Sequence, residues 1–407
     1  MATESPLPAA APAAEGFSAE RLERLHAYLR GATGADGYLG AVALIARHGR
    51  IVDWQAYGYR DLARREPLHR DAIFRIYSMT KTVTTVAVLM LMEEGKLSLD
   101  APLSRYLPGF DHPQVMTAGD ADAPVLRPAD KPITLHALLT HTAGYPAAMK
   151  GDEAAVKAME RVDPHGARDL RGFAERMSRV PLAADPQTRF AYDGAALELL
   201  ARVVEAASGQ PFERFLQQRI FDPLGMSDTG FSVPAAKRTR VVDITTMSED
   251  GHLRRADGPS AKHPGEPLNA YASGAGGLYS TAGDYARFAQ MLLDGGTLDG
   301  HVLLGRKTVE LMLRNHLTML PPPRNEAAAG EGFGLGGYVV LDPARRGQPG
   351  SVGQFGWSGA ASTYYMIDPQ EDLLAILLLQ HLPRGDGGKD LPRLSRGFYA
   401  LVYQALQ

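Results

Sequence analysis

The amino-acid sequence contains no cysteine among its 407 residues. Disulfide bonds, thiolate nucleophiles and cysteine-ligated metals are therefore excluded. The same absence fits a reducing compartment, and we expect a cytoplasmic protein. Long apolar runs are also missing, because the most apolar stretch, residues 86–92, is followed directly by Glu93 and Glu94. A run of this length is too short to cross a bilayer, so we expect no membrane span.

Long runs of one charge are absent as well. The 43 basic and 46 acidic residues give a formal net charge of -3. The chain therefore lacks the basic footprint of a nucleic-acid-binding protein, and we expect no nucleic-acid partner. The histidines show no metal-ligand spacing, so no metal site is assigned. The glycine-rich residues 332–337 do not join a strand to a helix, which argues against a nucleotide-binding loop.

Hydrophobic periodicity and turn residues divide the chain into elements. Residues 1–16 are rich in Ala and Pro and lack the features of a signal peptide, so we expect a disordered tail. Residues 115–130, with two prolines, are expected to form a loop. Strands are expected at residues 40–47, 50–57, 334–341, 362–367 and 373–380. Helices are expected at residues 17–29, 82–92, 134–140, 154–159, 170–179, 194–208, 281–293 and 391–406.

Strands at both ends of the chain around a helical middle favour an α/β (α+β) fold. We expect an antiparallel sheet flanked by helices, with an inserted, mainly helical domain. The sheet domain is predicted to comprise residues 17–75 and 285–407, and the helical domain residues 76–284.

The strongest chemical signal is the sequence Ser78-Met79-Thr80-Lys81, which follows an extended run and opens an apolar helix. Residues three apart share a helix face, so the Ser78 hydroxyl and the Lys81 amine are expected to touch. An early helical residue also has a free backbone N–H, which can bind a developing oxyanion. The stretch thus predicts a nucleophile, a base and half of an oxyanion hole.

Two later segments are candidates for the missing parts of such a site. Tyr192 lies between a proline-marked turn and a predicted helix, where its phenol can assist proton transfer beside a cation. Residues 356–361, which contain Trp357, precede a predicted strand, and their small side chains permit close approach of a ligand. Read alone, Tyr192 fits an ordinary packing role and Trp357 fits a core position.

Taken together, Ser78-x-x-Lys81, Tyr192 and the segment 357–359 resemble the motifs of the serine β-lactamase-related hydrolases. This group contains class C β-lactamases, D-Ala-D-Ala carboxypeptidases and family VIII carboxylesterases. The resemblance covers about residues 17–405. Flanking segments typical of the group are residues 95–100, 133–144 and 274–281.

The resemblance implies a β-lactamase/transpeptidase-like fold with the site between its two domains. It also implies that Ser78 is the nucleophile and that Lys81 and Tyr192 activate it. The backbone N–H groups of Ser78 and Ala360 would form the oxyanion hole. An acyl-enzyme forms on Ser78, and water or an alcohol releases it. No metal or organic cofactor is implied.

Two departures from the group pattern bear on the substrate. Position 194 is glycine, behind Asp193, where lactamases and peptidases usually have an asparagine that binds the substrate amide. Trp357 stands where lactamases usually have Lys or His, which helps bind the substrate carboxylate. Both changes favour a neutral acyl ester of short to medium length, as in family VIII esterases. Weak β-lactamase activity stays open. Substrate contacts are expected from Trp357, Ser358, Gly359 and Asp193.

Two alternatives remain at this point. An acyltransferase of the same fold would use an alcohol or amine in place of water, and a non-catalytic relative would keep the cleft without turnover. A Ser-His-Asp triad through His141 is disfavoured, because His141 lies in a turn that looks structural and no Gly-x-Ser-x-Gly elbow occurs. The oligomeric state is not predicted.

Overall fold

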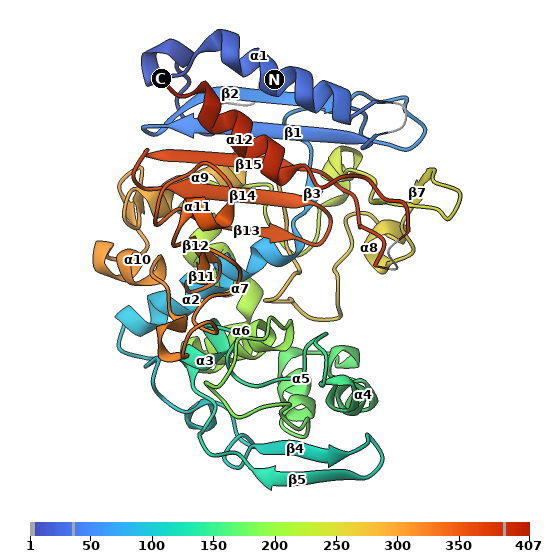
Figure 1. Ribbon diagram of the computed structural model, residues 1–407, viewed down its shortest axis with the longest axis vertical. Coiled ribbons are helices and arrows are strands. Elements are labelled where there is room, and N and C mark those ends of the chain that lie inside the picture. Colours follow the sequence, from blue (N-terminus) through green and yellow to red (C-terminus); the bar gives the residue numbers. More distant parts are fainter. Residues whose placement is uncertain (1–4, 35–36, 386–387) are drawn as a thin grey trace.

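The computed structural model describes residues 5–34, 37–385 and 388–407 (Figure 1). Its centre is a seven-stranded antiparallel sheet in the order β11-β12-β13-β14-β15-β1-β2. The predicted fold class is confirmed, since strands from both ends of the chain meet where β15 pairs with β1. The strands are β1 (Gly40–Arg47), β2 (Arg50–Gly58), β11 (Glu331–Phe333), β12 (Tyr338–Val340), β13 (Phe355–Gly359), β14 (Thr363–Asp368) and β15 (Leu373–Leu378).

The sheet is buried on both faces, as the side chains of β1 show. Val42 and Leu44 belong to one hydrophobic cluster, whereas Ala43 and Ile45 belong to another. This alternation follows from the two-residue period of a strand. Helices α1 (Ala19–Ala32) and α12 (Ser395–Ala405) cover one face, and α9 (Ala282–Leu293) covers the other (Figure 1).

Helix α2 (Thr80–Glu93) carries the candidate motif and forms the centre of the molecule. All its residues from Thr80 to Leu91 are buried, including Lys81 and four threonines. It packs against α6 (Ala195–Ser208) in the helical half of the molecule (Figure 1). Within the described residues, no helix combines the length and the hydrophobicity needed to cross a membrane.

The remaining elements are short. The other helices are α3 (Leu135–Leu139), α4 (Glu153–Val162), α5 (Leu170–Met177), α7 (Phe212–Leu216), α8 (Pro259–Lys262), α10 (Arg306–Met312) and α11 (Pro343–Arg346). The two-stranded sheets pair β3 (Phe74–Arg75) with β8 (Tyr279–Ser280), β4 (Gln114–Gly119) with β5 (Pro124–Pro128), β6 (Thr245–Met247) with β7 (Leu253–Arg255), and β9 (Thr297–Leu298) with β10 (His301–Val302). The expected domain boundaries at residues 76 and 284 stay a prediction.

Three expectations about local structure were wrong. Residues 5–16 are not a disordered tail, because Leu7 is buried and the N–H of Ile51 donates to Pro8 at 2.7 Å; residues 1–4 lie outside the described residues. The expected loop at residues 115–130 is the β4–β5 hairpin, whose prolines stand at strand ends, where no ladder bond is lost. The expected strand at 334–341 is correct only for β12, because residues 334–337 form the turn between β11 and β12, with Gly336 at φ 82°.

Candidate active site

The sequence predicts Ser78 in the first turn of a helix, whereas the structure places it just before that helix. It occupies a single 3-10 turn, Tyr77–Met79, directly before α2. Tyr77 adopts a left-handed backbone at φ 42°, a conformation that an aromatic residue rarely takes. This strained residue sets the entry into the turn and leaves the Ser78 side chain partly exposed.

Lys81 contacts Ser78 as the spacing predicted. Its Nζ donates to the Ser78 Oγ at 3.1 Å and to the backbone carbonyl of Ala275 at 2.7 Å. The side chain is buried, with 3% of its surface exposed. Because an amine held between two oxygen atoms can move little, Nζ stays within proton-transfer distance of the hydroxyl.

Glu198, on α6, supports this lysine, and sequence reasoning missed it. Its carboxylate accepts hydrogen bonds from the Ser273 hydroxyl at 2.5 Å and the Gly274 N–H at 2.9 Å. These contacts hold the segment that presents the Ala275 carbonyl to Lys81. Burial raises the pKa of Glu198 to about 7, against the opposing effects of Ser273 and the nearby Lys81 charge.

Tyr192 stands beside Lys81, but its hydroxyl points toward the sheet. The Lys81 Nζ lies 5.1 Å from the centroid of the Tyr192 ring. The Tyr192 hydroxyl accepts a hydrogen bond from Trp357 Nε1 at 3.2 Å. The structure thus brings Ser78, Lys81 and Tyr192 together, while a proton-shuttle role of Tyr192 stays a prediction.

Trp357 forms an aromatic wall with its neighbours on β11 and before α6. Its ring centroid lies 5.1 Å from that of Tyr192 and 5.2 Å from that of Phe333. Phe190 extends the wall, 5.1 Å from Phe333. The side of the site opposite Ser78 therefore offers apolar surface rather than a cation.

The backbone groups expected to form the oxyanion hole are free to bind a ligand. Neither the Ser78 N–H nor the Ala360 N–H donates a hydrogen bond to any described residue. Gly359 fixes the approach of the two segments, because a Cβ at this position would lie 2.2 Å from the Ile76 carbonyl oxygen. Gly359 is therefore needed for close packing, and its expected contact with substrate stays a prediction.

Asp193 is engaged by protein groups on both carboxylate oxygens, and its expected contact with substrate stays a prediction. One oxygen accepts from the Ala196 N–H at 2.7 Å, and the other lies 3.3 Å from His141 Nδ1. His141 is 1% exposed and its ring lies 4.6 Å from that of Tyr192. Burial lowers the pKa of His141, while Asp193 raises it. Both residues position Tyr192, and His141 does not contact Ser78.

Ser358 and Trp357 project to opposite faces of β13, because strand residues alternate. Ser358 pairs with Tyr364 on β14, and Trp357 pairs with Tyr365. The Tyr365 hydroxyl donates to Thr82 on α2 at 2.8 Å. Tyr364 instead belongs to the cluster under α12. Ser358 thus faces away from Ser78, on the face that α12 borders.

Arg75 is another buried charged residue, and no sequence motif singles it out. Its side chain is fully buried and donates to the carbonyls of Gly277 at 2.7 Å and Glu266 at 2.6 Å. Its guanidinium lies 3.7 Å from the centroid of the Tyr279 ring. Arg75 therefore fixes the segment that continues from the Ala275 carbonyl.

Comparisons with known proteins agree with this geometry. A model of the beta-lactamase family matches residues 25–397. The chain belongs to the beta-lactamase family. Protein Rv1367c of Mycobacterium tuberculosis is 35% identical over 84% of this chain and 86% of its own length. Esterase EstB of Burkholderia gladioli is 30% identical over 89% of this chain and 91% of its own length.

A solved structure extends the likeness to three dimensions. EstCE1, described as a hydrolase with promiscuous acyltransferase activity, superposes with a TM-score of 0.75 at 25% identity. The match covers 95% of this chain and 98% of EstCE1. The prediction of a beta-lactamase-family serine hydrolase, most like the esterases of the family, is confirmed.

Proposed function

We propose that this protein is a carboxylesterase that hydrolyses short to medium acyl esters through an acyl-enzyme on Ser78. The observation that carries the proposal is the 3.1 Å contact between the buried Lys81 Nζ and the Ser78 Oγ. Membership of a family with esterase relatives supports the reaction type. We further propose a cytoplasmic location, supported by the absence of cysteine.

In the proposed mechanism, Lys81 acts as the base and takes the proton of the Ser78 hydroxyl while Oγ attacks the ester carbonyl carbon. The negative charge that develops on the carbonyl oxygen is stabilised by the N–H groups of Ser78 and Ala360. The carbon–oxygen bond to the alcohol then breaks, and the proton taken up by Lys81 passes through the Tyr192 hydroxyl to the departing alkoxide oxygen. Water adds to the acyl-enzyme by the same steps in reverse order, which releases the acid and restores Ser78.

The aromatic wall supports an uncharged group next to the ester. The centroid of the Trp357 ring lies 5.1 Å from that of Tyr192 and 5.2 Å from that of Phe333. Transfer of apolar acyl surface from water to such a wall is favourable by roughly 25 cal/mol for each Å² buried. A peptide-like substrate with a carboxylate at this point would have no cationic partner.

Hydrolysis of 4-nitrophenyl butyrate, followed by the absorbance of the released nitrophenolate, tests the proposal. A fluorophosphonate should label Ser78 covalently, and Ser78→Ala should lose both hydrolysis and labelling. Retained hydrolysis in Ser78→Ala would overturn the assignment of the nucleophile. Nitrocefin, run beside the esters, measures any β-lactamase activity.

Acyl transfer is a second candidate function, favoured by the likeness to EstCE1. An acceptor alcohol would then replace water in the second half of the reaction. Adding a primary alcohol to the esterase assay and quantifying the new ester separates the two outcomes. A transfer product in excess of the free acid at low alcohol concentration would indicate a transferase.

A further inference from the structure

Tyr192 lies on an irregular segment, residues 188–194, that carries its ring into the candidate active site. Among the described residues, the backbone N–H groups of residues 188–192 donate to only one other backbone group, from Ala191 to the carbonyl of His141 at 2.9 Å. Tyr192 itself is 36% exposed, so packing encloses it only in part. The position of this segment therefore depends on contacts made by its side chains.

Arg189, three residues before Tyr192, makes such a contact by forming an ion pair with Asp152. One terminal nitrogen of its guanidinium group lies 2.7 Å from each carboxylate oxygen of Asp152. Only 2% of the Asp152 side chain and 23% of the Arg189 side chain are exposed. Because the pair lies mostly out of solvent, dissolved salt screens the attraction much less than it would on the surface.

Asp152 is itself held in place on both sides, so it can serve as an anchor. It directly precedes α4, and its backbone carbonyl accepts from the Val156 N–H in the first turn of that helix at 2.8 Å. Its carboxylate also accepts from the Ala147 N–H at 3.1 Å. The ion pair with Arg189 therefore ties the segment that carries Tyr192 to the start of α4.

Stability alone is a poor explanation for this ion pair. When two charges are buried together, the cost of removing both from water offsets much of their attraction. The Nε of Arg189 adds to that cost, because it is shut off from solvent and has no hydrogen-bond partner among the described residues. The best-attested use of a buried ionic group is to select one arrangement of the chain. The arrangement that this pair selects is the placement of the segment that carries Tyr192.

The placement of Tyr192 bears directly on the proposed reaction. Its ring centroid lies 5.1 Å from the Lys81 Nζ, and its hydroxyl accepts from the Trp357 Nε1 at 3.2 Å. These contacts orient the ring, and a separate anchor is needed for the backbone that carries it. A displacement of about 1 Å at a reacting group can lower the rate of an enzyme about 10²-fold.

We propose that the ion pair between Arg189 and Asp152 positions Tyr192 for proton transfer at Ser78. The inference rests on the proposed esterase function and adds two positioning residues to it. In the proposed mechanism the Tyr192 hydroxyl serves both the formation and the hydrolysis of the acyl-enzyme. Loss of the ion pair should therefore lower kcat and leave KM within about two-fold of the wild-type value.

Two variants of the full-length protein separate positioning from stability. Arg189→Met leaves the Asp152 carboxylate buried without its partner, so it should lower the Tm and lower kcat on 4-nitrophenyl butyrate about ten-fold or more. The double variant Arg189→Met/Asp152→Asn leaves no unpaired charge, and the new amide oxygen can still accept from the Ala147 N–H. Its Tm should return most of the way to the wild-type value, whereas its kcat should stay low.

Tryptophan fluorescence reports the position of Tyr192 without a substrate. The chain contains two tryptophans, so Trp54→Phe leaves Trp357, which donates to the Tyr192 hydroxyl, as the only reporter. In this background, Tyr192→Phe removes the acceptor and gives a reference emission spectrum. Arg189→Met/Asp152→Asn should shift the Trp357 emission in the same direction as Tyr192→Phe, because the displaced hydroxyl no longer meets the indole N–H.

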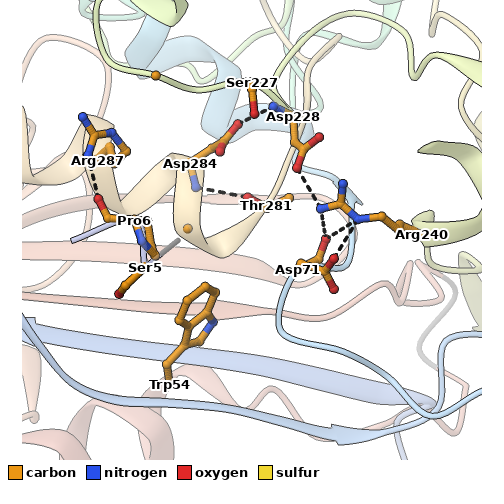
Figure 2. Close-up of a pocket in the computed structure, with 12 residues that line it drawn as sticks. Ser5, Pro6, Trp54, Asp71, Ser227, Asp228, Arg240, Thr281, Asp284 and Arg287 are labelled. Carbon is orange, nitrogen blue, oxygen red and sulfur yellow. Dashed lines mark hydrogen bonds and ion pairs between the residues drawn. The ribbon is translucent and has the colours of Figure 1, made fainter. Parts of the chain in front are cut away.

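A second ion pair supplies the matched control. Figure 2 shows Arg240 between Asp71 and Asp228, in a cavity of about 460 Å³ at the start of α9. Arg240 lies 2.7 Å from Asp228, and the two side chains are 26% and 14% exposed. Within the described part of the chain, the lining of this cavity includes none of the candidate catalytic residues. Arg240→Gln should lower the Tm, because two carboxylates lose a shared partner, and should leave kcat and the Trp357 emission unchanged.

Failure of the positioning role and failure of the esterase proposal give different results. If kcat recovers together with the Tm in Arg189→Met/Asp152→Asn, the ion pair only stabilises the fold, and the inference is overturned. An unchanged Trp357 emission in the same variant would overturn it as well. If the wild-type protein hydrolyses no ester, the esterase proposal fails, and the emission measurement alone then decides whether the ion pair positions Tyr192.

Discussion

Replacing Glu198 separates its two effects, on stability and on the position of Lys81. Glu198→Gln imitates the protonated acid, because its amide oxygen can accept from the Gly274 N–H and its NH₂ group can donate to the Ser273 hydroxyl. Glu198→Ala instead leaves both partners buried without an acceptor. The first change removes a titrating group, and the second also removes the support of the Ala275 carbonyl.

The pH dependence follows from the raised pKa of Glu198, about 7 in the folded protein against 4.5 for a solvent-exposed glutamate. As the pH rises, the unfolded chain loses this proton first, so the free energy of unfolding falls between pH 4.5 and pH 7. The pKa difference, at about 1.4 kcal/mol for each pH unit, amounts to about 3 kcal/mol. In Glu198→Gln, which has no titrating group at this position, the free energy of unfolding should not fall in this way.

Urea denaturation at pH 4.5, 6 and 8 measures the effect. Wild type and Glu198→Gln should have similar midpoints at pH 4.5, and the variant should be the more stable at pH 8 by up to about 3 kcal/mol. Glu198→Ala should be less stable than Glu198→Gln at every pH, by about 1–3 kcal/mol for each orphaned donor. Its kcat/KM on 4-nitrophenyl butyrate should fall about 10- to 100-fold, because Lys81 loses a fixed acceptor.

Two results would refute this reasoning. If the midpoint difference between wild type and Glu198→Gln is the same at pH 4.5 and pH 8, Glu198 does not titrate as its burial requires. If Glu198→Ala keeps full activity, the Ala275 carbonyl is not held by Glu198. A matched control is Glu213→Gln, an exposed acid on α7, which should shift neither quantity.

Further predictions concern the residues around Ser78. Lys81→Ala should lower kcat/KM on 4-nitrophenyl butyrate by about 10² or more, the scale of a positioned acid–base group, and a smaller loss would remove Lys81 as the base. Gly359→Ala should nearly abolish activity, because the new Cβ would lie 2.2 Å from the Ile76 oxygen; an active variant would show that the segment can shift. Arg75→Met should lower the Tm, since two backbone carbonyls lose a buried donor; an unchanged Tm would contradict the role given to Arg75.

Local sequence signals predicted the sheet strands near both ends and the contact between Ser78 and Lys81. Both depend on short-range periodicity, which the printed sequence contains. The same reasoning wrongly predicted that residues 5–16 are disordered. These residues are ordered by contacts with Ile51 on β2, which amino-acid composition does not reveal. The β4–β5 hairpin was missed for a related reason: its prolines stand at strand ends, which the sequence alone does not reveal.

The missed site residues share one property: each acts through a partner distant in the sequence. Glu198 reaches Lys81 through residues 273–275, and Arg75, on β3, donates to Gly277, which follows that segment. A motif search selects residues by the spacing of their neighbours, so it finds Ser78 and Lys81 on one helix. It cannot find Glu198, because the role of this carboxylate depends on the backbone carbonyl of Ala275, which lies 77 positions later in the chain.

The same limit applies to the charged groups near the candidate site. Trp357 removes the cation expected next to the ester, and that substitution is visible in a motif. Arg393 and Arg396 lie some 40 positions later, just before and within α12, and no motif connects them with Ser78. Only the fold places them around one pocket with Ser358.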